Sequence, residues 1–389
     1  MNIFLLLTIA MLMIILMLRR HIPIGPCMLT SGIFIWLMKA PELPYLVQAL
    51  RETLTMPRTY DIIFALYFVM CLEIELRTSG ALAGMVQALQ RIFSSAKVTL
   101  AVMPAFLGLL PSLGGARFSA PIVEEASKNL PIEQEHKAAI NFWFRHIFEF
   151  SSPIIPGMIM ACNIAGVSYS EFILHLAWLT VLAFSAGWFV LIRPIKADSS
   201  RTEAIANDSQ GMQDLWLALS PVIITFILVV FCGFNASAGM GLVTACLFLV
   251  LRFTNRGVGL KDVVVGALDI KMFLNVLCIL YFIQILTVTH VLQEIVAAFQ
   301  SSPLPVPVII ACVSFIIGVL TGMSQGHVAI VMPIVAAMQT GSLNLAGVAM
   351  AFGIACSRQR ICALLSPSII SKPTFLKHLS QFCFAKSLF

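Results

Sequence analysis

Long apolar segments separated by short polar ones recur along nearly the whole chain. Most are close to the length, about 20 residues, that an α-helix needs to cross the hydrocarbon core of a bilayer. They lack the alternation of apolar and polar residues over about 10 residues that is typical of a membrane β-barrel. The pattern predicts spanning helices at 2–18, 22–38, 60–77, 138–165, 171–193, 214–233, 237–252, 271–289, 345–366 and, in a more polar stretch, 374–389.

Two further apolar segments are interrupted halfway along their length. Residues 97–130 and 306–338 are long enough to enter a membrane and return, and Gly, Ser and Pro or Thr break each one at its midpoint. Irregular backbone at membrane depth is tolerated only where protein or a water-filled cavity satisfies its amides. We therefore predict a re-entrant hairpin in each segment.

The two hairpins resemble each other at a nearly constant spacing. Residues 108–114 (GLLPSLG) align with 318–324 (GVLTGMS), and the tripeptide Pro-Ile-Val at 121–123 recurs at 333–335. A shorter amphipathic stretch precedes each hairpin, and an apolar run interrupted by Ser-Pro follows it, at Ser152-Pro153 and at Ser366-Pro367. The chain therefore contains an internal repeat of a hairpin followed by a broken helix.

The repeat divides the chain into two halves joined by one long polar segment. We predict a first repeat over 1–195, with its broken helix at 138–165, and a second over 214–389, with its broken helix at 345–370. The linker, 196–213, is expected in the cytoplasm. Each half has an odd number of crossings, so the repeats must have inverted orientations. The expected fold is an all-α polytopic membrane protein with about 10 spans and two hairpins.

Lysine and arginine agree with this topology. With the N-terminus outside, sixteen of these residues fall on the cytoplasmic side and four on the external side, as expected if basic loops stay inside. The first apolar run is followed, and not preceded, by its charges Arg19 and Arg20, which is the reverse of a secretory signal. We therefore expect a retained first helix and a multi-pass protein of the plasma or inner membrane.

Composition supports a bilayer as the solvent and excludes several functions. Of 389 residues, 59% are hydrophobic and 11% charged, whereas soluble domains have about 25% charged residues. The sequence contains no nucleotide-binding loop, no metalloprotease motif and no nucleophile elbow. Its ten cysteines are scattered singly, without metal or redox spacing, and the net charge of +6 reflects cytoplasmic loops rather than a nucleic-acid surface. We expect no enzyme activity, cofactor or nucleic-acid partner.

The hairpin tips and helix breaks are the candidate binding sites. Helix ends and unwound amides there would attract anions, while the adjoining carbonyl groups could hold Na⁺. The alternative is that their small residues only allow tight helix packing. The candidate substrate-binding residues are Ser112, Gly114, Gly115, Arg117, Arg145, Ser151, Ser152, Thr321, Gly322, Ser324 and Ser366. The candidate residues for a coupling ion are Ser112, Ser151, Thr321, Ser366 and Glu149.

Charged residues at membrane depth are mostly cationic. Such groups are costly and usually face a cavity or a partner, and those of this chain are Arg117, Arg145, Arg358, Arg360 and Glu149. Arg117 could contact substrate or brace its hairpin, and Arg145 and Glu149, four residues apart, could simply neutralise each other. Four other acids are interpreted as solvated helix ends, with proton coupling as the alternative: Glu73, Glu75, Glu124 and Glu125.

The stretches LLPSLGGARFSAPIVEEASKNL and INFWFRHIFEFSSPIIPGMIMA resemble an integral membrane family known as domain of unknown function 401. That family is grouped with the ion transporter superfamily, which includes dicarboxylate–sodium symporters and citrate and gluconate permeases. The resemblance implies an elevator-type fold, in which a transport domain slides past a scaffold, and often a homodimer. Relatives bind carboxylates at positions matched here by Ser112, Gly114, Ser151, Ser152, Thr321, Ser324 and Ser366. The polar C-terminal stretch 371–389 departs from the repeat, which leaves the last span and the side of the C-terminus open.

These observations predict a secondary active transporter. We expect symport of a small organic anion, most simply a carboxylate, with Na⁺ or H⁺ by alternating access, in a homodimer embedded in the bilayer. The alternative is an intramembrane hydrolase or assembly factor that does not transport but uses a transporter-like scaffold. Neither the substrate nor the coupling ion has a signature in the sequence.

Overall fold

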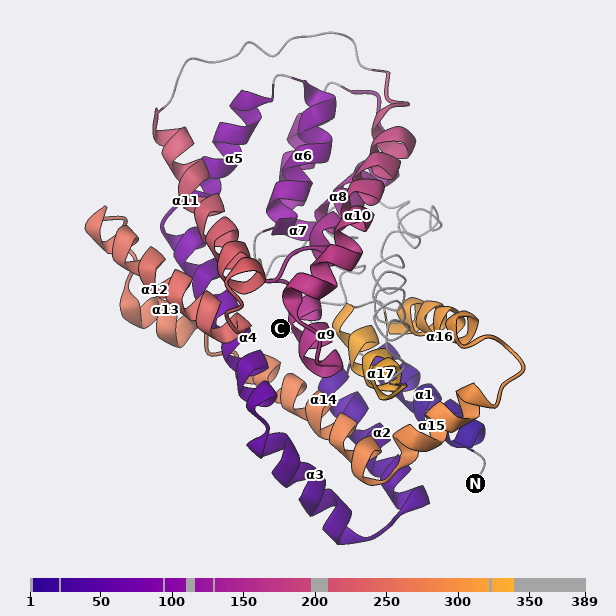
Figure 1. Ribbon diagram of the computed structural model, residues 1–389. Coiled ribbons are helices and arrows are strands. Elements are labelled where there is room, and N and C mark those ends of the chain that lie inside the picture. Colours follow the sequence, from indigo (N-terminus) through magenta and orange to yellow (C-terminus); the bar gives the residue numbers. More distant parts are fainter. Residues whose placement is uncertain are drawn as a thin grey trace.

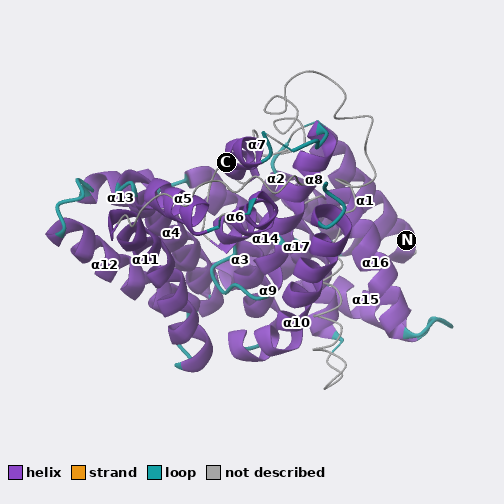
Figure 2. Ribbon diagram, turned by 90° about the horizontal axis from the view of Figure 1, so that it is seen from above, coloured by secondary structure: helices purple, strands orange, loops and turns teal. Residues whose placement is uncertain are grey.

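Helices are the regular elements of the computed structural model, which describes residues 3–20, 22–93, 95–109, 116–128, 130–196, 209–321 and 324–338. The described residues contain no strand, and short connections join most helices (Figure 2). The first half contains α1 (Ile3–Arg19), α2 (Ile24–Lys39), α3 (Leu43–Thr55), α4 (Pro57–Thr78), α5 (Ala81–Ile92), α6 (Ala96–Leu109), α7 (Ala116–Ala126), α8 (Gln134–Arg145), η1 (Ile147–Phe150), α9 (Pro156–Ala165), α10 (Tyr169–Gly187) and η2 (Trp188–Ile192). The second half contains α11 (Ser209–Phe226), η3 (Ile227–Phe231), α12 (Ala236–Phe253), α13 (Leu260–Gly266), α14 (Ile270–Val288), α15 (Val291–Gln300), α16 (Val306–Thr321) and α17 (Ser324–Ala337).

The predicted all-helical class is confirmed for the described residues. Every predicted span before residue 339 coincides with a helix or, at 138–165, with a broken pair of helices. Four helical segments are long and apolar enough to cross a bilayer: Tyr169–Ile192, Gly211–Phe231, Ala236–Phe253 and Leu260–Val288. The predicted spans 345–366 and 374–389 lie outside the described residues.

Both segments predicted as hairpins fold as pairs of helices. In 97–130, α6 packs against α7, and in 306–338, α16 packs against α17. Residues 110–115 and 322–323, which join the two helices of each pair, lie outside the described residues. The amphipathic stretches that precede the hairpins form α5 and α15.

Helices of the two halves pack against each other in pairs. The helix α2 lies along α14, α4 along α12, and α5 along α11 (Figure 1). Glycines allow two of these approaches, because a Cβ on Gly25 would lie 2.6 Å from Cα of Asn275 and one on Gly241 would lie 2.9 Å from the Phe68 ring. Small residues at helix contacts are typical of membrane proteins, where close packing replaces the hydrophobic effect as the driving force.

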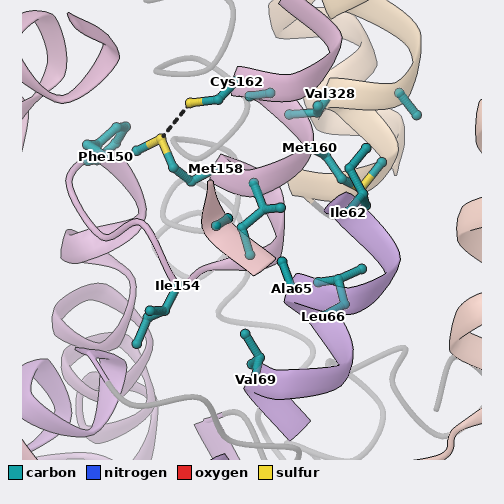
Figure 3. Close-up of a cluster of buried hydrophobic side chains, with 14 of the residues drawn as sticks. Ile62, Ala65, Leu66, Val69, Phe150, Ile154, Met158, Met160, Cys162 and Val328 are labelled. Atoms are coloured by element: carbon teal, nitrogen blue, oxygen red, sulfur yellow. Dashed lines mark hydrogen bonds between the residues drawn. The ribbon is translucent and has the colours of Figure 1, made fainter. Parts of the chain in front are cut away.

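The centre of the molecule is formed by α4, α9 and α17. Figure 3 shows Ile62 and Leu66 of α4 facing a cluster that includes Met158 and Met160 of α9 and Val328 of α17. Each of these five side chains is almost completely buried. The second half of the broken helix therefore packs between the first half of the fold and the second hairpin.

Two helices were not predicted from the apolar pattern. The helix α3 has exposed apolar residues beside Arg51 and Glu52, and α13 contains only seven residues. Both helices are too short or too polar to be recognised as membrane spans from the sequence. The two helices occupy corresponding positions in the two halves of the chain, since α3 directly precedes α4 and α13 directly precedes α14.

Candidate functional site

The interruption of the helix at 138–165 is the best-defined candidate site. The α8 helix ends at Arg145, the 3₁₀-helix η1 covers 147–150, and α9 does not begin until Pro156. Prolines at 153 and 156 have no backbone N–H and cannot continue a helix from the preceding turn. The interruption therefore includes the predicted break at 151–153 but is wider, because it starts at His146.

The first hairpin packs directly against this interruption. A Cβ on Gly108, at the end of α6, would lie 2.0 Å from the carbonyl oxygen of Arg145, so only glycine fits there. On the other arm, Ser119 of α7 donates a 2.5 Å hydrogen bond to Oδ1 of Asn141 in α8. The end of α6 thus lies next to the end of α8.

The two serines of the break have different surroundings. The hydroxyl of Ser151 lies 2.9 Å from the hydroxyl of Thr180 in α10. Ser152 is 2% exposed, and its Oγ has no hydrogen-bond partner among the described residues. A buried hydroxyl without a partner costs free energy, and such groups are often explained by a ligand, ion or water.

Ionisable groups are concentrated in the same place. Arg145 is 6% exposed and Glu149 is 7% exposed. His146 donates from Nδ1 to the carbonyl of Phe142 over 2.7 Å, and its Nε2 lies 3.9 Å from Oε1 of Glu149. Oε2 of Glu149 has no hydrogen-bond partner in the part of the chain that is described. The break therefore offers a cation, an acid and hydroxyl groups within a few residues.

The second hairpin approaches the break from its other end. The α17 helix packs along α9, while α6 packs along α8. Ser324 is half-buried at the first position of α17, and Thr321 ends α16. His327, one turn further along α17, is completely buried. The structure thus places the interrupted helix between the helices of both hairpins.

For several predicted site residues, the position or the side-chain environment lies outside the described part of the chain. Ser112, Gly114, Gly115, Gly322 and Ser366 lie outside the described residues, as do Arg358 and Arg360. Arg117 belongs to α7 and Thr321 to α16, but the environment of neither side chain is described. Of the predicted set, Arg145, Glu149, Ser151 and Ser152 lie in the interruption or at its edge.

One polar cluster was missed by the sequence analysis. Asp61, near the start of α4, accepts hydrogen bonds at Oδ1 from the backbone N–H of Ser237, over 3.1 Å, and from its hydroxyl, over 2.6 Å. Asn163, at the end of α9, donates to Oδ2 of Asp61 over 3.2 Å and lies 3.1 Å from the hydroxyl of Tyr169. The sequence signal for this cluster was Asp61 itself, because an acid within a predicted span usually has a polar or charged partner.

The interpretation of four acids as solvated helix ends is wrong for two of them. Glu73 and Glu75 are 6% and 1% exposed, because neighbouring helices such as α5 and α13 pack on α4. Oε2 of Glu75 has no hydrogen-bond partner among the described residues. Glu125 is exposed as expected, and Glu124 forms a 2.9 Å ion pair with Lys137.

The fold and the site together define a class of protein. The described chain is all-helical, four of its helical segments could span a membrane, and polar groups are buried around an interrupted helix. These properties are those of a helical membrane protein. The family model described as "Protein of unknown function (DUF401)" matches residues 2–372, and the chain belongs to this family. No curated protein matches the chain.

Proposed function

We propose that this protein is a secondary active transporter of a small organic anion, most simply a carboxylate. The observation that carries the proposal is the interrupted helix α8–α9, whose buried Arg145 and Ser152 and half-buried Ser151 lie between two hairpin segments. Discontinuous helices with polar groups at membrane depth are the usual binding sites of secondary transporters. The hairpin tips, with Ser112, Gly114, Gly115, Arg117, Thr321, Gly322 and Ser324, and the second break at Ser366 complete the proposed site.

An inverted repeat is common among secondary transporters, and two matching hydrogen bonds support one in this protein. The N–H of Gly25, the second residue of α2, donates to Oδ1 of Asn275 in α14 over 3.1 Å. The N–H of Ser237, the second residue of α12, donates to Oδ1 of Asp61 in α4 over 3.1 Å. The start of α2 in the first half and the start of α12 in the second half therefore make the same contact, each with the fourth α-helix of the other half.

The packing suggests which parts would move. In the proposed elevator mechanism, α2, α4, α12 and α14 belong to the scaffold, and the hairpins with α8, α9 and α10 belong to the transport domain. The proposed domains remain 1–195 and 214–389, joined by 196–213 in the cytoplasm. The N-terminus is outside, in the plasma or inner membrane, as the distribution of Lys and Arg favours. A homodimer would anchor the scaffold.

The driving ion in this proposal is Na⁺ or H⁺. Backbone carbonyls and hydroxyls at Ser112, Ser151, Thr321 and Ser366 could hold Na⁺. The buried carboxyl groups of Glu149 and Glu75 are candidates to carry a coupling proton instead.

Uptake into proteoliposomes tests the proposal. Purified protein is reconstituted, and labelled mono- and dicarboxylates are offered under imposed Na⁺ or H⁺ gradients. We expect gradient-driven accumulation of at least one anion, lost in Ser152→Leu because the larger side chain fills the break. Ser301→Leu, at an exposed position after α15, is the matched control and keeps wild-type uptake. Absence of flux for every anion, with protein that elutes as a folded species, would favour a protein that does not transport.

A further inference from the structure

A cavity lies at the C-terminal end of α9, away from the break in the interrupted helix. It has a volume of about 150 Å³ and is lined by residues of α3, α4, α9, α14, α15 and α17. None of the residues predicted for the binding site lines it. We call it the Arg58 cavity, after the charged residue in its wall.

Arg58 makes one end of this cavity positive. Its side chain is half-buried, and no described carboxylate lies within ion-pair distance of the guanidinium. With the Gln284 amide oriented to suit its neighbours, Arg58 Nη2 donates to the amide oxygen over 3.0 Å. The remaining guanidinium N–H groups have no described hydrogen-bond acceptor.

The nearest acid is occupied by amide groups. Glu52 accepts a 2.9 Å hydrogen bond from Gln48 at Oε1 and a 3.1 Å hydrogen bond from Gln284 at Oε2. Glu52 is also absent from the lining of the cavity. Its carboxylate lowers the positive potential near Arg58, but it forms no ion pair with the guanidinium among the described residues.

The threonine hydroxyls of the wall do not add donors. The hydroxyls of Thr53, Thr59 and Thr287 donate to the backbone carbonyls of Ala49, Thr53 and Ile283, over 2.8, 2.7 and 2.9 Å. The rest of the wall is mainly apolar and includes Ile164, Leu280 and Ala336. The cavity thus combines one cationic end with a mainly aliphatic interior.

These properties select a class of ligand. An engineered apolar cavity of about 150 Å³ holds a benzene molecule, so a ligand of about six heavy atoms fits this volume. A guanidinium binds one carboxylate in a bidentate pair, and an aliphatic wall accommodates a short hydrocarbon chain. We infer that the Arg58 cavity binds a short-chain aliphatic monocarboxylate of about the size of butyrate. Dicarboxylates bind it less well, because a second carboxylate would face no cation.

This site is separate from the proposed transport site and has a distinct consequence. Its walls come from α4 and α14 and also from α9 and α17, which the proposed function assigns to parts that move relative to each other. A ligand that contacts both parts favours the arrangement in which the cavity exists. Binding itself does not depend on transport and is measurable on purified protein.

Thermal unfolding of the detergent-solubilised full-length protein tests the inference. A ligand that binds only the folded state raises the unfolding temperature with its concentration. We expect sodium butyrate to raise the temperature above the value in sodium chloride of equal ionic strength, and sodium succinate to raise it less. Arg58→Gln removes the cation and loses the shift, whereas Arg51→Gln, at an exposed position of α3, keeps it.

A second variant tests the cavity independently, in case Arg58→Gln does not fold. Ala336→Leu fills the cavity from α17 without changing any charge, so it also loses the butyrate shift. A shift that survives in Arg58→Gln or in Ala336→Leu overturns the inference. Equal effects of butyrate and chloride on the wild-type protein overturn it as well. Wild-type uptake of an anion in proteoliposomes together with no butyrate shift would refute this site and leave the proposed function standing.

Discussion

At the scale of single residues, the acid Asp61 connects three helices. Its carboxylate satisfies the backbone N–H and hydroxyl of Ser237 at the start of α12 and holds Asn163 at the end of α9. The first N–H groups of a helix have no partner within the helix, and an acid placed there also favours the positive end of the helix dipole. Asn275 performs the same capping for α2 with a neutral amide.

Two substitutions of Asp61 distinguish the contribution of its hydrogen bonds to the start of α12 from the contribution of its negative charge. Asp61→Ala leaves the part-buried N–H of Ser237 without this acceptor and is expected to lower the free energy of unfolding by about 1–2 kcal/mol. Asp61→Asn keeps an acceptor, as Asn275 does in the other half, and is expected to lose less than half as much. Thermal unfolding in detergent measures both changes. Equal destabilisation by the two variants would show that the charge, and not the cap, is what α12 requires.

At the scale of elements, the contact between α6 and the end of α8 depends on one glycine. Gly108 brings the first hairpin against the carbonyl of Arg145, where no side chain has room. The obstacle is backbone, which cannot move aside as a flexible side chain can. The position of the hairpin relative to the interrupted helix is therefore fixed by the absence of a Cβ.

Gly108→Val is expected to displace the hairpin arm from the break. Because the displacement changes the proposed binding site, uptake in proteoliposomes should fall by at least tenfold, with a destabilisation of about 1–3 kcal/mol from overpacking. Gly266→Ala is the control, since its Cβ would meet only a methyl group of Ile74, at 3.1 Å, which can rotate away. Wild-type uptake by Gly108→Val would contradict a role for this junction.

At the scale of the whole molecule, the contacts divide into those within a proposed body and those between bodies. Asp61 and Asn163 touch across the boundary between α4 and α9, whereas Glu124 and Lys137 touch within the hairpin and α8. An elevator motion must break contacts of the first kind and preserve those of the second. We therefore expect a covalent link to stop uptake at the Asp61–Asn163 pair and to leave it unchanged at the Glu124–Lys137 pair.

Cross-linking distinguishes these expectations. In a background without other cysteines, joining Asp61→Cys to Asn163→Cys with a reducible thiol-reactive cross-linker is expected to stop uptake, and reduction of the linker is expected to restore it. Joining Glu124→Cys to Lys137→Cys with the same reagent is expected to keep uptake before and after reduction. Uptake that continues with Asp61 and Asn163 linked would rule out a sliding movement of α9 past α4.

The apolar pattern was sufficient to predict most of the described helices and the two helical hairpins. The prediction succeeded because a helix that crosses a bilayer must satisfy its own backbone hydrogen bonds, which leaves a long apolar run in the sequence. It failed for α3 and α13, whose length and composition carry no such signal. It also failed for the exposure of Glu73 and Glu75, because the burial of a helix end depends on which neighbours cover it.

The sequence by itself determined the helical class and the family, since these depend on local composition and spacing. Only the tertiary structure placed Asp61 against Ser237, Gly108 against Arg145, and Arg58 in the wall of a cavity. Each of these contacts joins helices distant in sequence. Their geometry follows from how whole helices pack, which no local pattern of residues encodes.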